Sequence, residues 1–540
     1  MPNRNLFSTQ HKSVKQHDTR NNAGGRAYKV SDEHALAQMV FTGTFNNTFY
    51  VDAKQQLDKF IELANNVSPE FLAKVAVLGR QEGFMKDAPA AAMSVLSNRD
   101  TDLVKLAWPK AIHNVRMLRT FVQIHLSGAC GRKGLGVVLR NLIRNQLEEM
   151  TAGNIFKNSI GNDPSMYDLI RLSHPRGHLS KEHDAMYAYI VNQNRDKKKQ
   201  REINYENLPG IVKHYESYKK GETKNIPRLP FQFLDSLGLD TKGWTYIAET
   251  CTWQTLRMNL NTLKRHGVMD DRGAVKMIAQ RLSDEELVSK AMVFPFQLLT
   301  TWKAMHDMPN EIIVAVQQAM EHATSNIPKF DCDNVYIMVD TSGSMQQPAI
   351  TEWDKRKQQD QYGRLAVRRR VQPNVARPSC CEVAALFASA ILRRNPTATV
   401  IPFDTEVRHV NINPMDSIMT NANKLSLHGG GTNCAAALAH LNDKRATGDL
   451  VIYLSDYESW CSSRGYSNGT PMANEWDKFK RRNKQAKLVC IDITPNDTTQ
   501  VQDNKDILSV GGFNDKVFNV IESFRLGVGH WVDYIKNADL

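Results

Sequence analysis

The chain has 540 residues, which is too long for one hydrophobic core and predicts two or three domains. Its 41% apolar and 23% charged content is typical of a folded globular protein and argues against a mainly disordered chain. The first residues contain no apolar signal segment, and no run of 18 apolar residues occurs. The eight cysteines show no C-x-x-C spacing, which argues against a zinc site or a disulfide framework. We therefore expect a cytoplasmic protein.

The net charge of +12 is concentrated in one part of the chain. Residues 1–330 hold 44 Lys and Arg against 33 Asp and Glu, whereas residues 331–540 hold 25 against 24. A polyanionic partner is therefore expected mainly on the first part. Helix faces that carry many lysines only for solvation would give the same count.

The first part of the sequence divides into a tail and a long helical region. Residues 1–30 are polar and basic and predict a flexible tail. Across residues 31–330, apolar residues recur at spacings of three and four, as in Leu135-Val138-Leu139-Leu142-Ile143. Helix after helix with short connections predicts an α-solenoid, although no fixed repeat length is visible.

The pattern changes near Pro328, where strand-like and helix-like segments begin to alternate. This order predicts a doubly wound α/β domain over residues 331–540. The expected strands cover residues 335–339, 397–403, 450–454, 488–493 and 517–521, and the expected helices include 381–394 and 434–441.

Oxygen-bearing side chains follow two of these strands and one glycine-rich loop. Asp340, Ser342 and Ser344 come directly after the first strand, and Asp456 follows the third. Thr432 lies after Gly429-Gly430-Gly431. Ligands of open α/β sheets bind at the carboxyl ends of the strands. Few charges and several hydroxyls suit a hard divalent cation, and we expect Mg²⁺.

Other interpretations of Asp340-Thr341-Ser342-Gly343 fit less well. An aspartic protease would need a second, paired carboxylate, and an EF-hand loop would need glycine at its sixth position. The triple glycine lacks the Lys-Ser/Thr pair of a P-loop. Hydroxyls that only cap turns, with no metal bound, remain the simple alternative.

Two stretches of the helical region present basic side chains. Arg132 and Lys133 precede a helix on which Arg140 and Arg144 are spaced i, i+4 and share a face, with Lys133 expected near the helix start. Arg171 and His174 lie three residues apart in the stretch that Pro175 ends. Such residues could hold phosphates or stack on bases, but a basic surface helix or a helix cap fits them equally well.

Two longer segments are also basic. Residues 195–228 combine ten Lys and Arg with Tyr205, Tyr215 and Tyr218, a composition that could hold phosphates and stack bases. Residues 346–379 form a long basic interruption inside the α/β domain. A solvated charged face explains the first segment equally well, whereas a loop as long as the second is usually functional or disordered.

The D-x-S-x-S motif with a distant Thr and Asp resembles the metal-ion-dependent adhesion site of von Willebrand factor A domains. Together with a helical region that carries D-L-I-R-L-S-H-P, it resembles the Ro autoantigen family of TROVE-module ribonucleoproteins over most of the chain. The resemblance implies a closed ring of HEAT-like helical repeats followed by a von Willebrand factor A domain with a bound divalent metal.

The resemblance also implies a function. Family members bind small noncoding Y RNAs on a basic outer surface and single-stranded 3′ ends of misfolded or decaying RNAs in a central hole. Carried over by position, Arg171, His174 and Lys157 match Y RNA contacts, while Gly161 and Asn162 lie where a further charge would be expected. A bacterial member could pass RNAs to an exoribonuclease such as polynucleotide phosphorylase.

We therefore predict a non-enzymatic RNA-binding scaffold that acts in RNA quality control, with one protein chain in each ribonucleoprotein. The alternative is a metal-dependent protein-adhesion module on a helical adaptor. The excess charge of residues 1–330 favours RNA, whereas the complete set of metal-ligand residues keeps the adaptor open.

Overall fold

The computed structural model describes residues 14–540 except 43–52, 84, 161–163, 178–179, 194–199, 235–236, 306, 333, 347–377, 427–428, 462–467, 494–497, 512–516 and 526–530. Within the described residues, no helix is long and apolar enough to span a membrane. The predicted fold class is confirmed, because helices dominate the first part and a parallel sheet forms the second.

The first eleven helices pack along one half of the helical region. They are α1 (Asp32–Thr42), α2 (Ala53–Asn66), α3 (Pro69–Gln81), α4 (Asp87–Leu96), α5 (Thr101–Ala111), α6 (Val115–Ser127), α7 (Val137–Glu149), α8 (Ala152–Lys157), α9 (Met166–Ser173), α10 (Lys181–Asn192) and α11 (Gly210–Lys219). Helices close in sequence pack together, as α3 does with α4 and α5. Their buried faces form one apolar core, in which Phe121 and Phe156 are almost completely enclosed.

The next helices form a second core. They are α12 (Phe231–Leu234), α13 (Thr241–Thr250), α14 (Trp253–Met258), α15 (Leu260–Arg265), α16 (Arg272–Leu282), α17 (Glu285–Lys290), α18 (Pro295–Ala304) and α19 (Asn310–His322). Short 3-10 turns lie at Tyr205–Asn207, Val268–Asp270 and Ala323–Asn326. Phe233 belongs to the first core and Leu234 to the second, so the chain passes between the cores at α12.

The α/β domain is built on a parallel sheet with strand order β4-β3-β5-β6-β8. Its elements are β3 (Val335–Asp340), a 3-10 turn at Gly343–Gln346, α21 (Cys380–Arg394), β4 (Thr399–Phe403), α22 (Ile418–Leu425), α23 (Ala436–Asp443), β5 (Leu450–Ser455), α24 (Pro471–Arg482), β6 (Lys487–Asp492), β7 (Thr498–Thr499), β8 (Ile507–Gly511), α25 (Val517–Arg525) and α26 (Trp531–Asn537). Side chains alternate across each strand. Ile337 and Ile452 therefore pack in one core with α21 and α25, whereas Met338 and Tyr453 pack in another with α23 and α24.

One strand predicted near the end of the α/β domain is a helix in the structure. Residues 517–521, expected to be a strand, belong to α25, and the last strand of the sheet is β8. Val517, Phe518, Ile521 and Phe524 are all buried, and these positions share one face of a helix. The β-branched residues of this stretch gave a misleading strand signal, because packing against the sheet overrides local propensity.

Each end of the chain packs against the part of the molecule that contains the other end. The expectation of a flexible tail is wrong for residues 14–30, because β1 (Thr19–Arg20) and β2 (Arg26–Lys29) pair with β7 in a small antiparallel sheet. Residues 1–13 lie outside the described residues. At the other end, Val532 and Ile535 of α26 pack into the core of the first eleven helices. Each part of the molecule is therefore held by a chain end of the other.

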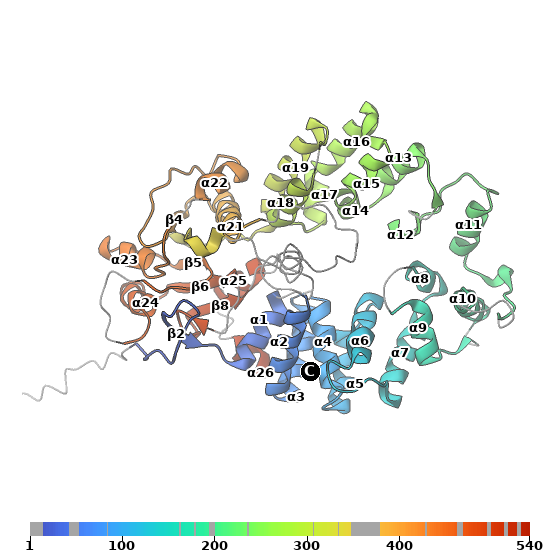
Figure 1. Cartoon of the computed structure of the whole chain (residues 1–540), viewed down its shortest axis with the longest axis horizontal. Helices are drawn as coiled ribbons and strands as arrows, with labels where there is room; N and C mark the ends of the chain where they lie inside the picture. The colour runs from blue at the N-terminus through green and yellow to red at the C-terminus, as the bar shows by residue number, and fades with distance from the viewer. Residues whose placement is uncertain are drawn as a thin grey trace, which may run out of the picture.

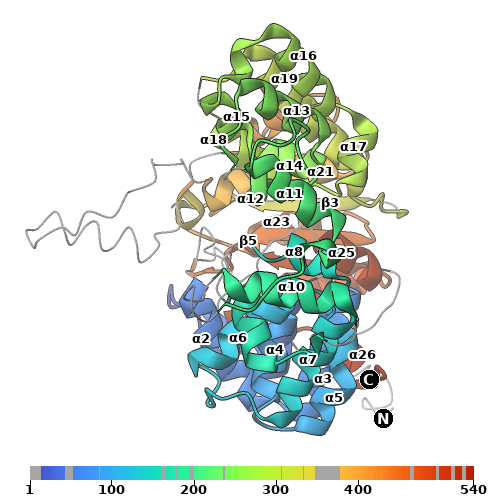
Figure 2. The ribbon, with the colours of Figure 1, turned by 90° about the vertical axis from the view of Figure 1, so that its right-hand side faces the viewer.

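The helices run in a ring from one side of the α/β domain round to another (Figure 1). A view from the side opposite the α/β domain shows α2–α7 and α10 below and α13 and α15–α19 above (Figure 2). At the first end of the ring, the buried His34 of α1 lies 3.0 Å from Asp503 through Nδ1 and Oδ2. Gln38 Nε2 donates to the carbonyl oxygen of Ser509 in β8 at 2.7 Å.

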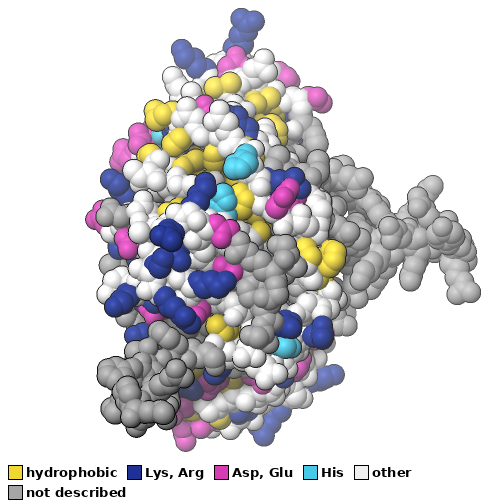
Figure 3. Space-filling view, turned by 90° about the vertical axis from the view of Figure 1, so that its left-hand side faces the viewer, with side chains coloured by type: hydrophobic (Ala, Val, Ile, Leu, Met, Phe, Trp, Pro, Cys, Tyr) yellow, Lys and Arg dark blue, Asp and Glu magenta, His cyan; other side chains and the backbone are white. Residues whose placement is uncertain are grey.

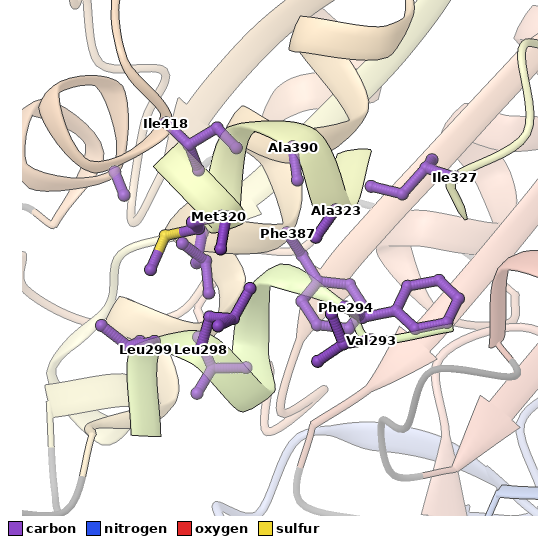
Figure 4. Close-up of a cluster of buried hydrophobic side chains, with 14 of the residues drawn as sticks. Val293, Phe294, Leu298, Leu299, Met320, Ala323, Ile327, Phe387, Ala390 and Ile418 are labelled. Atoms are coloured by element: carbon purple, nitrogen blue, oxygen red, sulfur yellow. The ribbon is translucent and has the colours of Figure 1, made fainter. Parts of the chain in front are cut away.

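The other end of the ring is closed by an apolar cluster and an ion pair. Val293, Phe294, Leu298 and Met320 of the helical part face Phe387, Ala390 and Ile418 of the α/β domain (Figure 4). The Phe387 ring lies 5.1 Å from that of Phe518, which stacks at 5.6 Å on Phe294. Lys303 Nζ lies 2.7 Å from both carboxylate oxygens of Glu382, which also caps the start of α21.

Replacing Phe387 with Ala should destabilise the closed ring by about 3–5 kcal/mol, because truncating a buried aromatic leaves a cavity. Thermal denaturation of the full chain measures the effect. Met415→Ala is the matched control, since that side chain is 76% exposed and its loss should change stability by no more than about 0.5 kcal/mol. Equal shifts for the two variants would contradict a packed closure.

Asp503→Asn should lower stability more at pH 6 than at pH 9. Burial by itself lowers the pKa of His34, but the charge and hydrogen bond of Asp503 and the Ser509 carbonyl raise it above 6.5 overall. The stabilisation is therefore complete below about pH 6.5 and is lost as pH rises through the folded-state pKa. We expect a loss of about 1.5–3 kcal/mol at pH 6.

The thermal midpoint across this pH range is the measurement. Asp416→Asn, which breaks a pair with Lys424 on α22, serves as the control and should show no such pH dependence. Parallel pH profiles for the two variants would show that His34 is not charged in the closed ring.

Candidate metal centre and basic surface

Asp340 is the last residue of β3 and lies at the carboxyl edge of the sheet, where it is completely buried. Its Oδ1 accepts a hydrogen bond from the Ser342 backbone N–H at 2.9 Å. Its Oδ2 accepts one from Ser455 Oγ, at the end of β5, at 2.5 Å. These bonds fix the carboxylate in one orientation and leave lone pairs on both oxygens for a further partner.

The two serines after Asp340 link it to the second carboxylate. Ser342 Oγ lies 3.1 Å from Ser344 Oγ, and the nearby Ser344 hydroxyl lowers the pKa of Asp456 against the larger effect of burial. Asp456 follows β5 and is 5% exposed. The structure therefore brings both predicted carboxylates and both serines together, with Asp340, Ser342 and Asp456 buried and Ser344 exposed at the edge of the cluster.

The glycine-rich loop lies directly against this cluster. The Gly343 N–H donates to the carbonyl oxygen of Gly430 at 2.9 Å. A Cβ at Gly429 would lie 2.5 Å from Asp404 Oδ2 and 2.6 Å from the Thr341 carbonyl oxygen, so only glycine fits this approach. The loop brings Thr432, which is 2% exposed, to the same edge of the sheet.

The surroundings of this cluster disfavour the charged forms of its two carboxyl groups. Burial and the nearby charge of Asp456 raise the pKa of Asp340 to about 7, and burial raises the pKa of Asp456 as well. Two buried carboxylates close together destabilise each other unless a positive charge lies between them.

A hard divalent cation such as Mg²⁺ fits this donor set. The described residues contain no group of three or more His, Cys, Asp or Glu that could hold a metal, so hydroxyls would supply the remaining protein ligands. Mg²⁺ accepts carboxylate and hydroxyl oxygens and retains several waters. Asp340, Ser342, Ser344, Thr432 and Asp456 would hold the ion, which would supply a positive charge and open coordination positions.

Asp404 and Ser455 are two residues of this edge that the sequence analysis did not assign. Asp404 follows β4, is completely buried and pairs with Arg408 at 2.7 Å. Ser455 holds Asp340, as described above. Both residues lie directly at the carboxyl end of a strand. The same position identified Asp340 and Asp456 in the sequence, so it could have identified Asp404 and Ser455 as well.

The predicted basic surface is centred on the end of α9. A capping box made by Ser165 and Asp168 starts this helix, and His174 ends it in the left-handed region at φ 51°. Arg171 and His174 are both exposed. Arg144 Nε of α7 donates to the Ser173 carbonyl oxygen at 2.8 Å, so the structure brings Arg144 to the end of α9.

The remaining predicted contacts spread along neighbouring elements. Arg140 is exposed on α7, one turn before Arg144. Lys133 was expected near the start of this helix, and α7 begins four residues later, at Val137. Lys133 lies in the preceding loop beside Arg132, with its aliphatic stem over Gly128. Lys157 is exposed at the end of α8, and α10 packs against both α8 and α9.

The structure describes only part of each of the two longer basic segments. Tyr215 is 7% exposed and packs on Phe156 and Phe233, so it cannot stack on a base, whereas Tyr205 is 56% exposed. Residues 194–199, which hold four of the ten Lys and Arg of the first segment, lie outside the described residues. So do residues 347–377, which hold all the Lys and Arg of the second segment, and Gly161 and Asn162.

Three comparisons with known proteins bear on this site. Residues 365–525 match the family model described as the Ro60 vWA domain, a range that includes Thr432 and Asp456. The chain is 22% identical over 555 residues to the RNA-binding protein RO60 of Deinococcus radiodurans, covering 97% of this chain and 98% of the relative. The crystal structure of the Deinococcus radiodurans RO (RSR) protein matches with a TM-score of 0.63 and 18% identity, covering 92% of this chain and all of that one.

The two whole-chain matches cover both the helical ring and the sheet domain, and the family model covers most of the sheet domain. The structural match shows the fold, in which a helical ring is joined to a von Willebrand factor A domain. Together these findings confirm the predicted resemblance: the chain is similar along almost its whole length to proteins of the Ro family, and its second domain matches the Ro60 type of von Willebrand factor A domain.

Proposed function

We propose that this chain is an RNA-binding scaffold and not an enzyme. The observation that carries the proposal is the group of exposed basic side chains where α7 meets α9, in a chain similar to a protein named for RNA binding. Arg171 and His174 are exposed and lie close in sequence to Ser173, whose carbonyl oxygen accepts a hydrogen bond from Arg144. Guanidinium and imidazole groups in this setting bind phosphates and stack on bases.

A small Y-type RNA is the ligand proposed for this outer surface. A second RNA class, with single-stranded 3′ ends, is proposed for the centre of the ring. The excess of positive charge in residues 1–330 supports both, because phosphate contacts need Lys and Arg. A central opening would admit one strand and exclude a duplex by its width, which would select misfolded or decaying RNAs with loose ends.

The scaffold would act in RNA quality control in the cytoplasm, with one protein chain in each ribonucleoprotein, and could pass RNA to an exoribonuclease such as polynucleotide phosphorylase. None of the eight cysteines, all of which the structure describes, forms a disulfide, which suits a reducing compartment.

The metal centre is proposed as a site for Mg²⁺ that recruits a partner. The cluster described above offers two carboxylates and three hydroxyls, so the shell of protein ligands is incomplete. A carboxylate or phosphate of a partner could take an open position on the ion.

A protein-adhesion module on a helical adaptor remains the second candidate. It is favoured by Trp460, which is 60% exposed although its backbone N–H is fixed to the Thr432 carbonyl at 3.2 Å. An exposed tryptophan beside a metal centre is a suitable anchor for a protein partner. The absorbance ratio at 260 and 280 nm of the purified protein separates the two candidates, since only the RNA scaffold should carry nucleic acid.

Replacing Arg171 and His174 together with Ala should weaken Y-type RNA binding by about 10- to 100-fold, because charge-assisted hydrogen bonds contribute about 1.5–3 kcal/mol. Both side chains are exposed, so the fold should persist. Titration of labelled RNA at fixed salt measures the affinity. Arg272→Ala with His409→Ala, exposed on α16 and after β4, is the control with the same residue types. Unchanged affinity in the first variant would refute the outer-surface site.

Asp456→Asn should have opposite effects with and without metal. In EDTA at pH 8 the variant should be more stable than the wild type, because it removes one of two buried like charges. The wild type should gain about 2.7 kcal/mol at Mg²⁺ a hundredfold above Kd, and the variant should gain almost nothing. Thermal denaturation with and without Mg²⁺ measures both effects. An equal response to Mg²⁺ in both proteins would exclude this cluster as the metal site.

A further inference from the structure

A patch of cations lies on the outer side of the von Willebrand factor A domain. Helices α23 and α24 pack against each other and cover the sheet face opposite to α21 and α25, away from the helical ring (Figure 1). The exposed basic residues at their C-terminal ends and in the loops that follow are Lys444, Arg445, Lys478, Arg481, Arg482 and Lys484. We call these six residues the outer basic patch. Lys and Arg side chains gather on the side of the molecule that carries these helices (Figure 3).

Acidic neighbours neutralise only part of the outer basic patch. The buried Glu475 pairs with Lys478 at 2.8 Å, and Asp477 pairs with Arg481. Within the described part of the chain, the other four members form no ion pair with a carboxylate. The patch therefore keeps uncompensated positive charge, although residues 331–540 as a whole carry 25 basic against 24 acidic residues.

Arg482 is held in place within the patch. Its guanidinium lies 5.8 Å from the centre of the Phe479 ring, and Nη2 donates to Asn442 Oδ1 at 2.6 Å. A cation fixed in this way loses little side-chain freedom when it binds an anion. The group is therefore preorganised as an anion contact.

A hollow runs beside Arg482 and Lys484. It has a volume of about 450 Å³ and is also lined by Asn334, Thr447, Asn483 and Gln485, with Asp449 as its one carboxylate. It lies at the amino ends of β3, β5 and β6, which is the edge of the sheet opposite to the metal centre. Cations and amide groups around a shallow hollow can bind phosphate oxygens.

We propose that the outer basic patch binds the phosphate backbone of base-paired RNA. This inference rests on the proposed RNA-binding function and assigns a second RNA contact to the von Willebrand factor A domain. The aromatic side chains beneath the patch, Trp476 and Phe479, are 5% and 0% exposed, so stacking on unpaired bases is not available there. Phosphate contacts remain, and they suit a duplex. Because the patch and the metal centre lie at opposite edges, RNA and a metal-bound partner can be held together.

The test replaces Lys444, Arg445 and Lys484 with Gln in the full chain and leaves the packed Arg482 in place. The probes are a hairpin RNA without a single-stranded tail and an unstructured oligo(U). Affinity for the hairpin should fall roughly 10- to 100-fold at physiological salt. The slope of log K against log salt should become shallower by about 0.9 for each lost phosphate contact. Affinity for oligo(U) should not change.

The matched control replaces Lys242, Arg272 and Lys276, which are exposed on α13 and α16, with Gln. It removes the same charge and should leave hairpin binding near the wild-type value. Hairpin affinities and salt slopes that are equal in the two triple variants would overturn the patch assignment while the RNA-binding proposal stands. A wild-type protein that binds neither probe would overturn both.

Discussion

The closed shape of this molecule depends on the burial of apolar side chains where α18 and α19 pack against α21 and α22. Phe294, Phe387 and Phe518 stack there in one cluster, and the core continues from the helical part into one face of the sheet without interruption. At the other end of the ring, α26 packs into the first helical core and α1 contacts β8. Two separate contacts therefore hold the sheet domain between the ends of the helical array.

This closure determines which surfaces of the sheet domain remain available. On one face of the sheet, α21 and α25 pack between the strands and the helical ring. On the other face, α23 and α24 cover the strands and lie on the outside of the molecule. The carboxyl edge carries the buried carboxylates of Asp340, Asp404 and Asp456, and the amino edge carries uncompensated cations. The same parallel topology thus separates the proposed metal centre from the proposed RNA contact, because all strands point the same way.

The sequence predicted the parts of the structure that depend on short-range pattern. The strand before Asp340 and the converging donors followed from periodicity and from the rule that ligands bind at strand ends. The pairing of β2 with β7 could not be predicted, because it joins residues about 470 positions apart through two short polar strands. The helix at Val517–Arg525 was missed because its β-branched residues mimic a strand. For the basic surface, exposure of Arg171 and His174 was predictable, whereas the contact of Arg144 with Ser173 depends on how α7 packs on α9.

We propose above that RNA binds the ring and its outer surface. Ultraviolet crosslinking of the purified, RNA-bound full chain, followed by identification of the crosslinked peptides, tests it most directly. We expect crosslinks in the peptides that contain Arg171 and His174 and on the helices of residues 31–330. Crosslinks confined to the sheet domain near Asp340 and Trp460, or protein that retains no RNA to crosslink, would contradict it.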